Sequence, residues 1–101
     1  MVKSSFGLSR EKLDMSHLHK RERLNGGDCV EVDCSHQCNV MVMTDSNYRA
    51  YKRGARFQYH GGFYKRLPAR IVVPDNDDWN IVIDLGGGSA RIRHSIRILA
   101  A

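Results

Sequence analysis

The chain has 101 residues, of which 42% are hydrophobic and 27% charged, and a formal net charge of +5 at pH 7. This length and balance predict one globular domain and exclude a disordered chain and a second domain. The sequence has no apolar run near the roughly 20 residues that a membrane helix needs, and its first residues lack the apolar stretch of a secretory signal. We therefore expect a cytoplasmic protein with no membrane partner.

The N-terminal part divides into a leader and the start of the domain. Residues 1–11 have no clear periodicity and are predicted to form a loose leader, whereas 12–101 are predicted to form a single domain. Apolar residues are spaced among polar ones in 12–19, which indicates a strand. Residues 21–28 are typical of a turn, and Asn25-Gly26 is the strongest signal in them.

Two further strands with different patterns come next. In 29–34 the residues alternate, so that two valines are expected to point inward and the acidic Glu31 and Asp33 outward. Residues 39–44 are nearly all apolar, which is typical of a strand that is covered on both faces.

A helix of one or two turns is predicted within residues 45–54, where the strand rhythm breaks. Asp45 or Ser46 can cap its start, because short polar side chains accept hydrogen bonds from the first free N–H groups of a helix. Gly54 suits the position just past its end, where a left-handed conformation is common.

Shorter strands are predicted after the helix. Residues 56–59 and 63–66 are interpreted as two strand pieces that are bent at Gly61-Gly62. Residues 69–73 form another short strand between two prolines.

Residues 79–99 contain two β-branched runs joined by glycines and predict a β-hairpin. A two-residue turn at Gly87-Gly88 would place Ile83 opposite Ile92 and Trp79 opposite Ile96. The residues expected to share the inner face are Trp79, Ile81, Ile83, Leu85, Ala90, Ile92, His94, Ile96 and Ile98.

About seven short strands with a turn every roughly 8–12 residues are typical of an antiparallel sandwich or small barrel. The predicted fold class is therefore all-β: an antiparallel β-sandwich (or small barrel) of about seven strands with one short helix, over residues 12–101.

Some of these residues also resemble a known family. The stretches concerned are Gly26-Gly27-Asp28-Cys29-Val30-Glu31-Val32, Ser46-Asn47-Tyr48, Gly61-Gly62 and Trp79-x-x-Val82-Ile83-Asp84-Leu85-Gly86-Gly87. Together they look like a bacterial family of small β-sandwich domains of unknown function, over about residues 12–99. Members of that family are sometimes fused to TIR-like domains. The resemblance implies a β-sandwich, a bacterial source and a sensing or adaptor role, and it assigns no catalytic residue.

The positive charge is concentrated in the middle of the chain. Between Arg49 and Arg70 there are seven basic residues and no acidic one, with aromatic residues interleaved. Cations neutralise phosphates and carboxylates, and aromatic faces stack on bases, so this mixture suits an anionic ligand or a nucleic acid. The alternative is a solvated basic face with its aromatic residues in the core. The candidate ligand-binding residues are Tyr48, Arg49, Tyr51, Lys52, Arg53, Arg56, Lys65, Arg66 and Arg70.

The cysteines offer a possible metal site. Cys34-x-His36-x-Cys38, with Cys29 nearby, supplies side chains that zinc accepts. Structural zinc sites use paired knuckles such as Cys-x-x-Cys, which this spacing does not provide. The number of cysteines is odd, and Cys29 and Cys34 would face opposite sides of one strand. We therefore expect three free thiols and no metal.

No convergent catalytic set is visible. Asp84, His94 and Ser95 are the residue types of a hydrolytic triad, but the predicted hairpin separates Asp84 from His94. The glycine run at 86–88 lacks the Gly-Lys-Ser/Thr ending of a phosphate-binding loop. We expect no enzyme activity and no cofactor.

The sequence therefore predicts a non-enzymatic binding or interaction module that engages a protein partner or an acidic ligand through a basic and aromatic surface. Nucleic-acid or nucleotide binding through residues 48–70 is the alternative, and the oligomeric state is left open.

Overall fold

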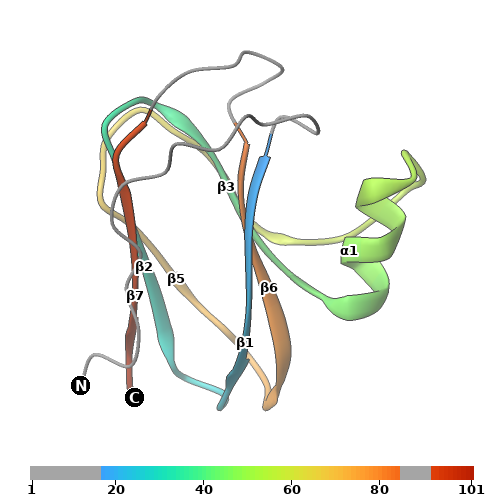
Figure 1. Cartoon of the computed structure of the whole chain (residues 1–101). Coiled ribbons are helices and arrows are strands. Elements are labelled where there is room, and N and C mark those ends of the chain that lie inside the picture. Colours follow the sequence, from blue (N-terminus) through green and yellow to red (C-terminus); the bar gives the residue numbers. More distant parts are fainter. Residues whose placement is uncertain (1–16, 85–91) are drawn as a thin grey trace.

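The computed structural model describes residues 17–84 and 92–101, which form two sheets and one helix (Figure 1). In chain order the elements are β1 (His17–Leu24), β2 (Cys29–Cys34), β3 (Cys38–Thr44), α1 (Asp45–Lys52), β4 (His60–Tyr64), β5 (Ala69–Val72), β6 (Asp77–Asp84) and β7 (His94–Leu99). One sheet has the order β1-β6-β3-β4 and the other the order β5-β2-β7. All neighbouring strands are antiparallel. The predicted all-β sandwich with one short helix is confirmed.

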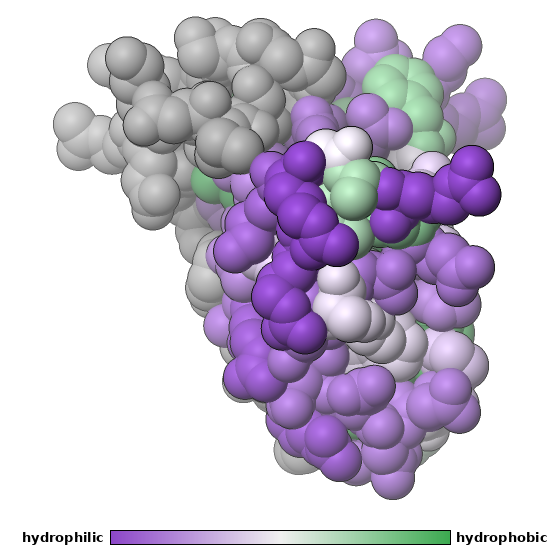
Figure 2. Space-filling model, turned by 90° about the vertical axis from the view of Figure 1, so that its right-hand side faces the viewer, coloured by the Kyte–Doolittle hydropathy of each residue, from purple (hydrophilic) through white to green (hydrophobic). Residues whose placement is uncertain are grey.

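The helix α1 lies on the outer face of the four-stranded sheet, on the side of the molecule away from β2, β5 and β7 (Figure 1). Figure 2 looks onto this side, where hydrophilic side chains dominate and a few apolar ones lie between them. The described residues contain no helix that is long and apolar enough to cross a membrane.

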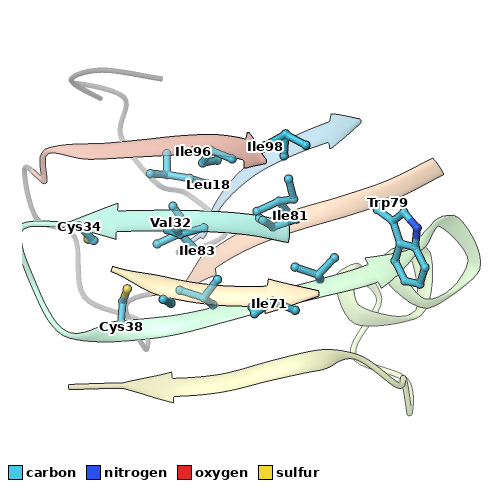
Figure 3. Close-up of a cluster of buried hydrophobic side chains, with 14 of the residues drawn as sticks. Leu18, Val32, Cys34, Cys38, Ile71, Trp79, Ile81, Ile83, Ile96 and Ile98 are labelled. Atoms are coloured by element: carbon cyan, nitrogen blue, oxygen red, sulfur yellow. The ribbon is translucent and has the colours of Figure 1, made fainter. Parts of the chain in front are cut away.

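The core lies between the inner faces of the two sheets (Figure 3). Val30 and Val32 of β2 are fully buried, as are Val40 of β3 and Ile81 of β6. Side chains alternate along a strand, so each strand contributes every second residue to this layer. Complete burial of such a side chain stabilises the fold by roughly 1.5–3 kcal/mol.

The predicted hairpin of residues 79–99 is wrong, because β6 and β7 belong to different sheets. Ile83 pairs with Leu18 and Val40, whereas Ile96 pairs with Val32. The two strands face each other across the core, and alternation points the same side chains inward in either arrangement. The inward positions that are confirmed as buried are Trp79, Ile81, Ile83, Ile92, His94, Ile96 and Ile98. The expected turn at Gly87-Gly88, with Leu85 and Ala90, lies outside the described residues.

The first strand is displaced along the sequence from its expected position. The structure extends β1 to Leu24, so the prediction of a turn from residue 21 is wrong for residues 21–24. Leu24 is fully buried, and its backbone pairs with Asp77 of β6. The charged residues 20–23, which precede Leu24, are therefore part of the paired strand. The turn itself follows directly, and the Asp28 amide N–H donates to the Asn25 carbonyl over 3.0 Å.

The strands β2 and β3 match their predictions closely. Residues 29–34 form β2, and β3 is buried on both faces as expected. Val40 and Val42 point into the core, whereas Met41 and Met43 belong to a second cluster on the outer face of the sheet.

The predicted helix is confirmed over Asp45–Lys52, but its N-cap residue is Thr44 and not Asp45 or Ser46. The Asp45 side chain is instead bound to Arg21 and Asn80. Gly54 has a φ of 75°, as expected for a glycine just beyond a helix end.

The strand piece predicted at 56–59 is wrong, because these residues form no strand, whereas the piece predicted at 63–66 is confirmed at Phe63 and Tyr64. The predicted bend at Gly61-Gly62 is also wrong, because both glycines lie inside β4. Gly61 has a φ of 120°, and a Cβ atom there would collide with the Val40 carbonyl oxygen. The glycine therefore allows β4 to lie close against β3, and it does not mark a corner between two strands. The strand predicted at 69–73 is confirmed as β5.

Candidate binding surface

The side of the molecule that carries α1 has an apolar base of its own. Met43 and Val82 are almost fully buried on the outer face of the four-stranded sheet, together with Met41. Tyr48 and Tyr51 of α1 pack over this base with Phe57. A helix of eight residues is marginal in isolation, so this packing is what holds α1 in place.

Histidines of β1 complete an aromatic cluster with the tyrosines of α1. The His19 ring stacks on the Tyr48 ring, with centroids 4.0 Å apart, and His17 Nε2 lies 3.0 Å from the Tyr48 hydroxyl. Lys52 Nζ lies 4.7 Å from the centroid of the Tyr48 ring, in cation–π range. The Tyr51 hydroxyl donates to Asp84 Oδ2 over 2.6 Å.

Burial changes the acid–base behaviour of this aromatic cluster. Partial burial lowers the pKa of His19 below its ordinary value, against the opposing effect of its hydrogen bond to Asn80. Burial also raises the pKa of Tyr48, and burial together with the hydrogen bond to Asp84 raises the pKa of Tyr51. Both phenols therefore remain protonated donors at neutral pH.

A polar network joins β1, β6 and α1 beneath the cluster. Asn80 is buried, and its Nδ2 donates to Asp45 Oδ1 over 2.8 Å and to the Met43 carbonyl over 3.3 Å. These two bonds orient the amide so that Oδ1 accepts from His19 Nε2 over 2.7 Å. Asp45 also accepts two hydrogen bonds from Arg21, at 3.0 and 2.8 Å, and the guanidinium lowers its pKa well below the ordinary range.

A cleft of about 560 Å³ opens beside the start of α1. Its lining residues are Val42, Met43, Thr44, Asn47, Phe57, Gln58, Tyr59, His60, Pro74, Asp75 and Trp79. The Asn47 side chain holds one wall, because its Oδ1 accepts from the Gln58 amide over 2.9 Å. Trp79 Nε1 fixes another by donating to the Asp75 carbonyl over 3.0 Å. Aromatic walls with a few polar groups are typical of ligand clefts of this size.

The structure brings only some of the predicted ligand-binding residues together. Tyr48, Arg49, Tyr51 and Lys52 lie on α1, and Arg53 follows directly at its C-cap. The cations of this segment are exposed, as is Arg56 in the connection to β4.

The remaining predicted cations lie elsewhere. Lys65 and Arg66 belong to the connection between β4 and β5 and are exposed. Arg70 is on β5 in the three-stranded sheet, on the opposite side of the sandwich from α1 (Figure 1). The residues from 48 to 70 therefore do not form one continuous surface.

Arg70 has a structural partner on its own sheet. Its Nε donates to Glu31 Oε2 over 2.9 Å, and Arg97 Nη1 donates to Glu31 Oε1 over 2.8 Å. Glu31 points outward as predicted, but it is buried beneath the two arginines and only 6% exposed. The charge of Arg70 is therefore partly neutralised.

Sequence reasoning did not identify His17, His19 and Asn80 as parts of this surface. The two histidines are two residues apart in a strand, and that spacing places both side chains on one face. This signal was present in the sequence. No comparable signal in the sequence indicates that Asn80 is buried, because an asparagine within an apolar run can equally be exposed.

The cysteines and other potential ligands form no metal centre in the part of the chain that the structure describes. Cys29, Cys34 and Cys38 are free thiols. No group of three or more His, Cys, Asp or Glu side chains among residues 17–84 and 92–101 is arranged to hold a metal ion.

Comparison with known proteins identifies a family. Residues 15–101 match the family model described as "Domain of unknown function (DUF1883)", while no curated protein and no solved structure gives a significant match. The match confirms the resemblance to a family of small domains of unknown function. Because the matched residues include all eight described elements and most of the sequence, the chain belongs to the DUF1883 family.

Proposed function

We propose that the domain is a non-enzymatic binding module that holds an acidic segment of a partner protein on the side that carries α1. The observation behind this proposal is the cleft of about 560 Å³ whose aromatic wall, Phe57 to His60, is preceded in the chain by exposed cations. Apolar side chains of a partner fit the cleft, and its carboxylates fit the exposed cations that precede the cleft wall in the chain.

The charge on this side favours a negatively charged partner. Arg49, Lys52, Arg53 and Arg56 are exposed, and none of them forms an ion pair within the described part of the chain. Unpaired arginines present several donors in a fixed geometry that matches a carboxylate. Their combined field also raises the local concentration of an acidic partner.

The aromatic residues supply contact area at the same place. Tyr59 is 45% exposed at the cleft, and its ring lies 5.5 Å from that of Phe57. Tyrosine and arginine are the residue types that contribute most strongly to protein interfaces.

Other observations support an interaction module. The sequence has no nucleophile elbow and no phosphate-binding loop, which supports a non-enzymatic role. The resemblance to bacterial domains that are sometimes fused to TIR-like domains supports a bacterial source and a sensing or adaptor role. The odd number of cysteines supports a cytoplasmic location.

The proposal is tested with a fluorescently labelled peptide that contains glutamates and one leucine, and with a matched peptide in which glutamine replaces each glutamate. We expect the wild-type protein to bind the acidic peptide at least about tenfold more tightly than the neutral one, because only the former pairs with the cations. Equal affinity for both peptides would contradict the proposal.

Two double variants locate the site. Arg53→Ala/Arg56→Ala removes two charges from the segment that leads from α1 to the cleft wall at Phe57, and Lys65→Ala/Arg66→Ala removes the same charge from the β4–β5 connection. We expect a loss of affinity of about tenfold or more in the first variant and a much smaller loss in the second. Equal losses would indicate a general charge effect and would contradict a site at the cleft.

Nucleic-acid or nucleotide binding is the second candidate function, favoured by the exposed Tyr59 ring, which follows several exposed cations in the chain. Bases stack on such rings, and phosphates pair with such cations. A labelled single-stranded oligonucleotide, titrated at low and at physiological salt, distinguishes this candidate. Binding that falls steeply with salt and exceeds binding of the acidic peptide would favour it over the acidic protein segment.

A further inference from the structure

Two cysteines lie at a corner where the chain passes from one sheet to the other. Cys34 is the last residue of β2 in the three-stranded sheet, and Cys38 is the first residue of β3 in the four-stranded sheet. Only residues 35–37 separate them. Both side chains point into the layer between the sheets (Figure 3), with exposures of 8% and 1%.

The two thiols belong to the same buried core cluster. Interaction with Cys38 lowers the pKa of Cys34, with a smaller contribution from the backbone of His36, and interaction with Cys34 together with burial raises the pKa of Cys38. Cys34 is therefore the thiol that more readily forms the nucleophilic thiolate.

A histidine stands next to this pair. His94 of β7 is the register partner of Cys34 and is also buried, so its side chain lies on the same face of the sheet. The carboxylate of Asp33 is on the other face, because Asp33 and Cys34 are consecutive in the strand. The surroundings of Cys34 thus combine the Cys38 thiol, the His94 imidazole and apolar side chains, and His36 acts on Cys34 through its backbone and its charge.

We propose that Cys34 and Cys38 form a redox-active pair, which a hydroperoxide converts into a disulfide that links the two sheets. The proposal stands on the position of both thiols at one corner of the sandwich, where Cys34 ends β2, Cys38 begins β3 and both side chains are part of one core cluster. Because only residues 35–37 lie between the two cysteines, the chain itself holds the two strand ends together where the bond would form. It is independent of the binding function proposed above.

The chemistry of the step balances. The Cys34 thiolate attacks an oxygen of the hydroperoxide and breaks the O–O bond, which leaves a sulfenic acid on Cys34 and releases an alkoxide that takes up the proton of the thiol. The Cys38 sulfur then attacks the Cys34 sulfur, forms the S–S bond and releases water. Two thiols lose two electrons in total, and the hydroperoxide gains them.

Cys29 provides an internal control. It lies in the same strand as Cys34 at an odd separation, so its side chain is on the outer face of the three-stranded sheet. Its register partners are Val72 and Leu99, and neither carries sulfur. A disulfide that includes Cys29 would require the sheet to unfold locally.

The test uses the full chain, treated with hydrogen peroxide, then alkylated and digested beside acidic residues. Cleavage at Asp33 separates Cys29 from the pair, whereas residues 35–37 contain no acidic residue and leave Cys34 and Cys38 in one peptide. We expect this peptide to be lighter by two hydrogen atoms and not alkylated, while Cys29 is alkylated. Alkylation of both Cys34 and Cys38, or a bond to Cys29, would overturn the proposal.

Single variants test the order of the two steps. In Cys38→Ala, Cys34 should accumulate as a sulfenic acid that reacts with dimedone, whereas Cys38 in Cys34→Ala should remain largely unlabelled. Cys29→Ala should form the disulfide as the wild type does. Equal labelling in the first two variants would overturn the assignment of Cys34 as the attacking thiol. Circular dichroism checks that each variant is folded, and the wild-type peptide map decides on the disulfide independently of the variants.

Discussion

The imidazole of His19 lies nearly flat against the ring of Tyr48, with 4.0 Å between the ring centroids and 13° between their planes. His19 belongs to β1, an edge strand, and Tyr48 to the only helix of the described residues. The stack therefore attaches α1 to the edge strand β1. It adds to the packing of α1 on the apolar base formed by Met41, Met43 and Val82. Stacked pairs of this kind contribute about 0.5–1.5 kcal/mol beyond the area that they bury.

Removing this ring should destabilise the domain. Tyr48→Ala deletes the stack on His19, the contact with His17 and part of the cover over Met41, and we expect a loss of about 1–3 kcal/mol in the free energy of unfolding. Urea denaturation measures the loss. Tyr59→Ala is the control, since Tyr59 is 45% exposed and its truncation should change stability by less than about 0.5 kcal/mol. Equal effects would show that α1 is not held by Tyr48.

His19 should titrate below the ordinary histidine range, because burial lowers its pKa. An unfolded chain protonates this side chain near pH 6.5, roughly its unperturbed value. Between that pH and the lower folded pKa, the unfolded state binds more protons, so stability falls as the pH is lowered through this window. NMR titration of the imidazole measures the pKa, and His19→Gln should remove this part of the pH dependence. A His19 pKa above 6.5 would contradict the arrangement.

Asp45 should contribute to acid sensitivity at lower pH. The Arg21 guanidinium and Asn80 lower its pKa in the folded state, so its stabilising contribution is complete above the unfolded value of about 3.9. That contribution is lost as the pH falls through the folded pKa. Acid denaturation of Asp45→Asn should therefore show a shallower loss of stability below about pH 4 than the wild type. Asp75→Asn, which changes an exposed carboxylate outside the network, should follow the wild-type curve.

The core should be sensitive at Ile83 in particular. This side chain is 1% exposed and lies in the central strand of the β1-β6-β3 arrangement. Ile83→Ala should lower the free energy of unfolding by about 2–5 kcal/mol, since it removes buried methyl groups and leaves a cavity. Val72→Ala, at a position that is 60% exposed, should cause a change of less than about 0.5 kcal/mol. A loss below half a kilocalorie at Ile83 would be incompatible with its buried position.

Two glycines with positive φ should respond differently to alanine. Gly54 has a φ of 75° and open space where a Cβ atom would lie, so Gly54→Ala should lower stability by only about 1 kcal/mol. Gly61→Ala adds a collision with the Val40 carbonyl to an unfavourable φ and should lower stability by more than about 2 kcal/mol. Thermal or urea unfolding measures both, and an equal cost would show that β4 lies further from β3.

Hydrophobic alternation predicted which residues are buried far better than it predicted which strands are neighbours. Ile83 and Ile96 were correctly expected in the core, although they lie on facing sheets and not on paired strands. A period of two residues defines the inner face of a strand, and that face is the same whether its neighbour is beside it or across the core. The glycine run at 86–88 favoured a tight hairpin between β6 and β7. In the structure, β6 pairs with β1 and β3, whereas β7 pairs with β2.

The candidate surface also shows that a local sequence pattern does not determine which distant segments come together. Charge and aromatic content drew attention to the segment that contains Tyr48 and Lys52, whose side chains lie within cation–π distance of each other on α1. The sequence could not reveal that Arg70 lies on the opposite sheet, because the chain changes sheets between β4 and β5. It also could not join His19 to Tyr48, since contacts between distant segments depend on strand order, which a local pattern does not determine.

The order of the strands also determines when the domain can fold. β1 pairs with β6 and β2 pairs with β7, so each sheet combines one of the first two strands with one of the last two. Such pairings require the closure of long loops before any contact is made, which slows folding to the millisecond-to-second range typical of sandwiches. During synthesis, β3 stays without its central neighbour until β6 has left the ribosome. Chains that stop before β6 would expose the apolar β3, and their fate would be aggregation or degradation before a native sheet could form.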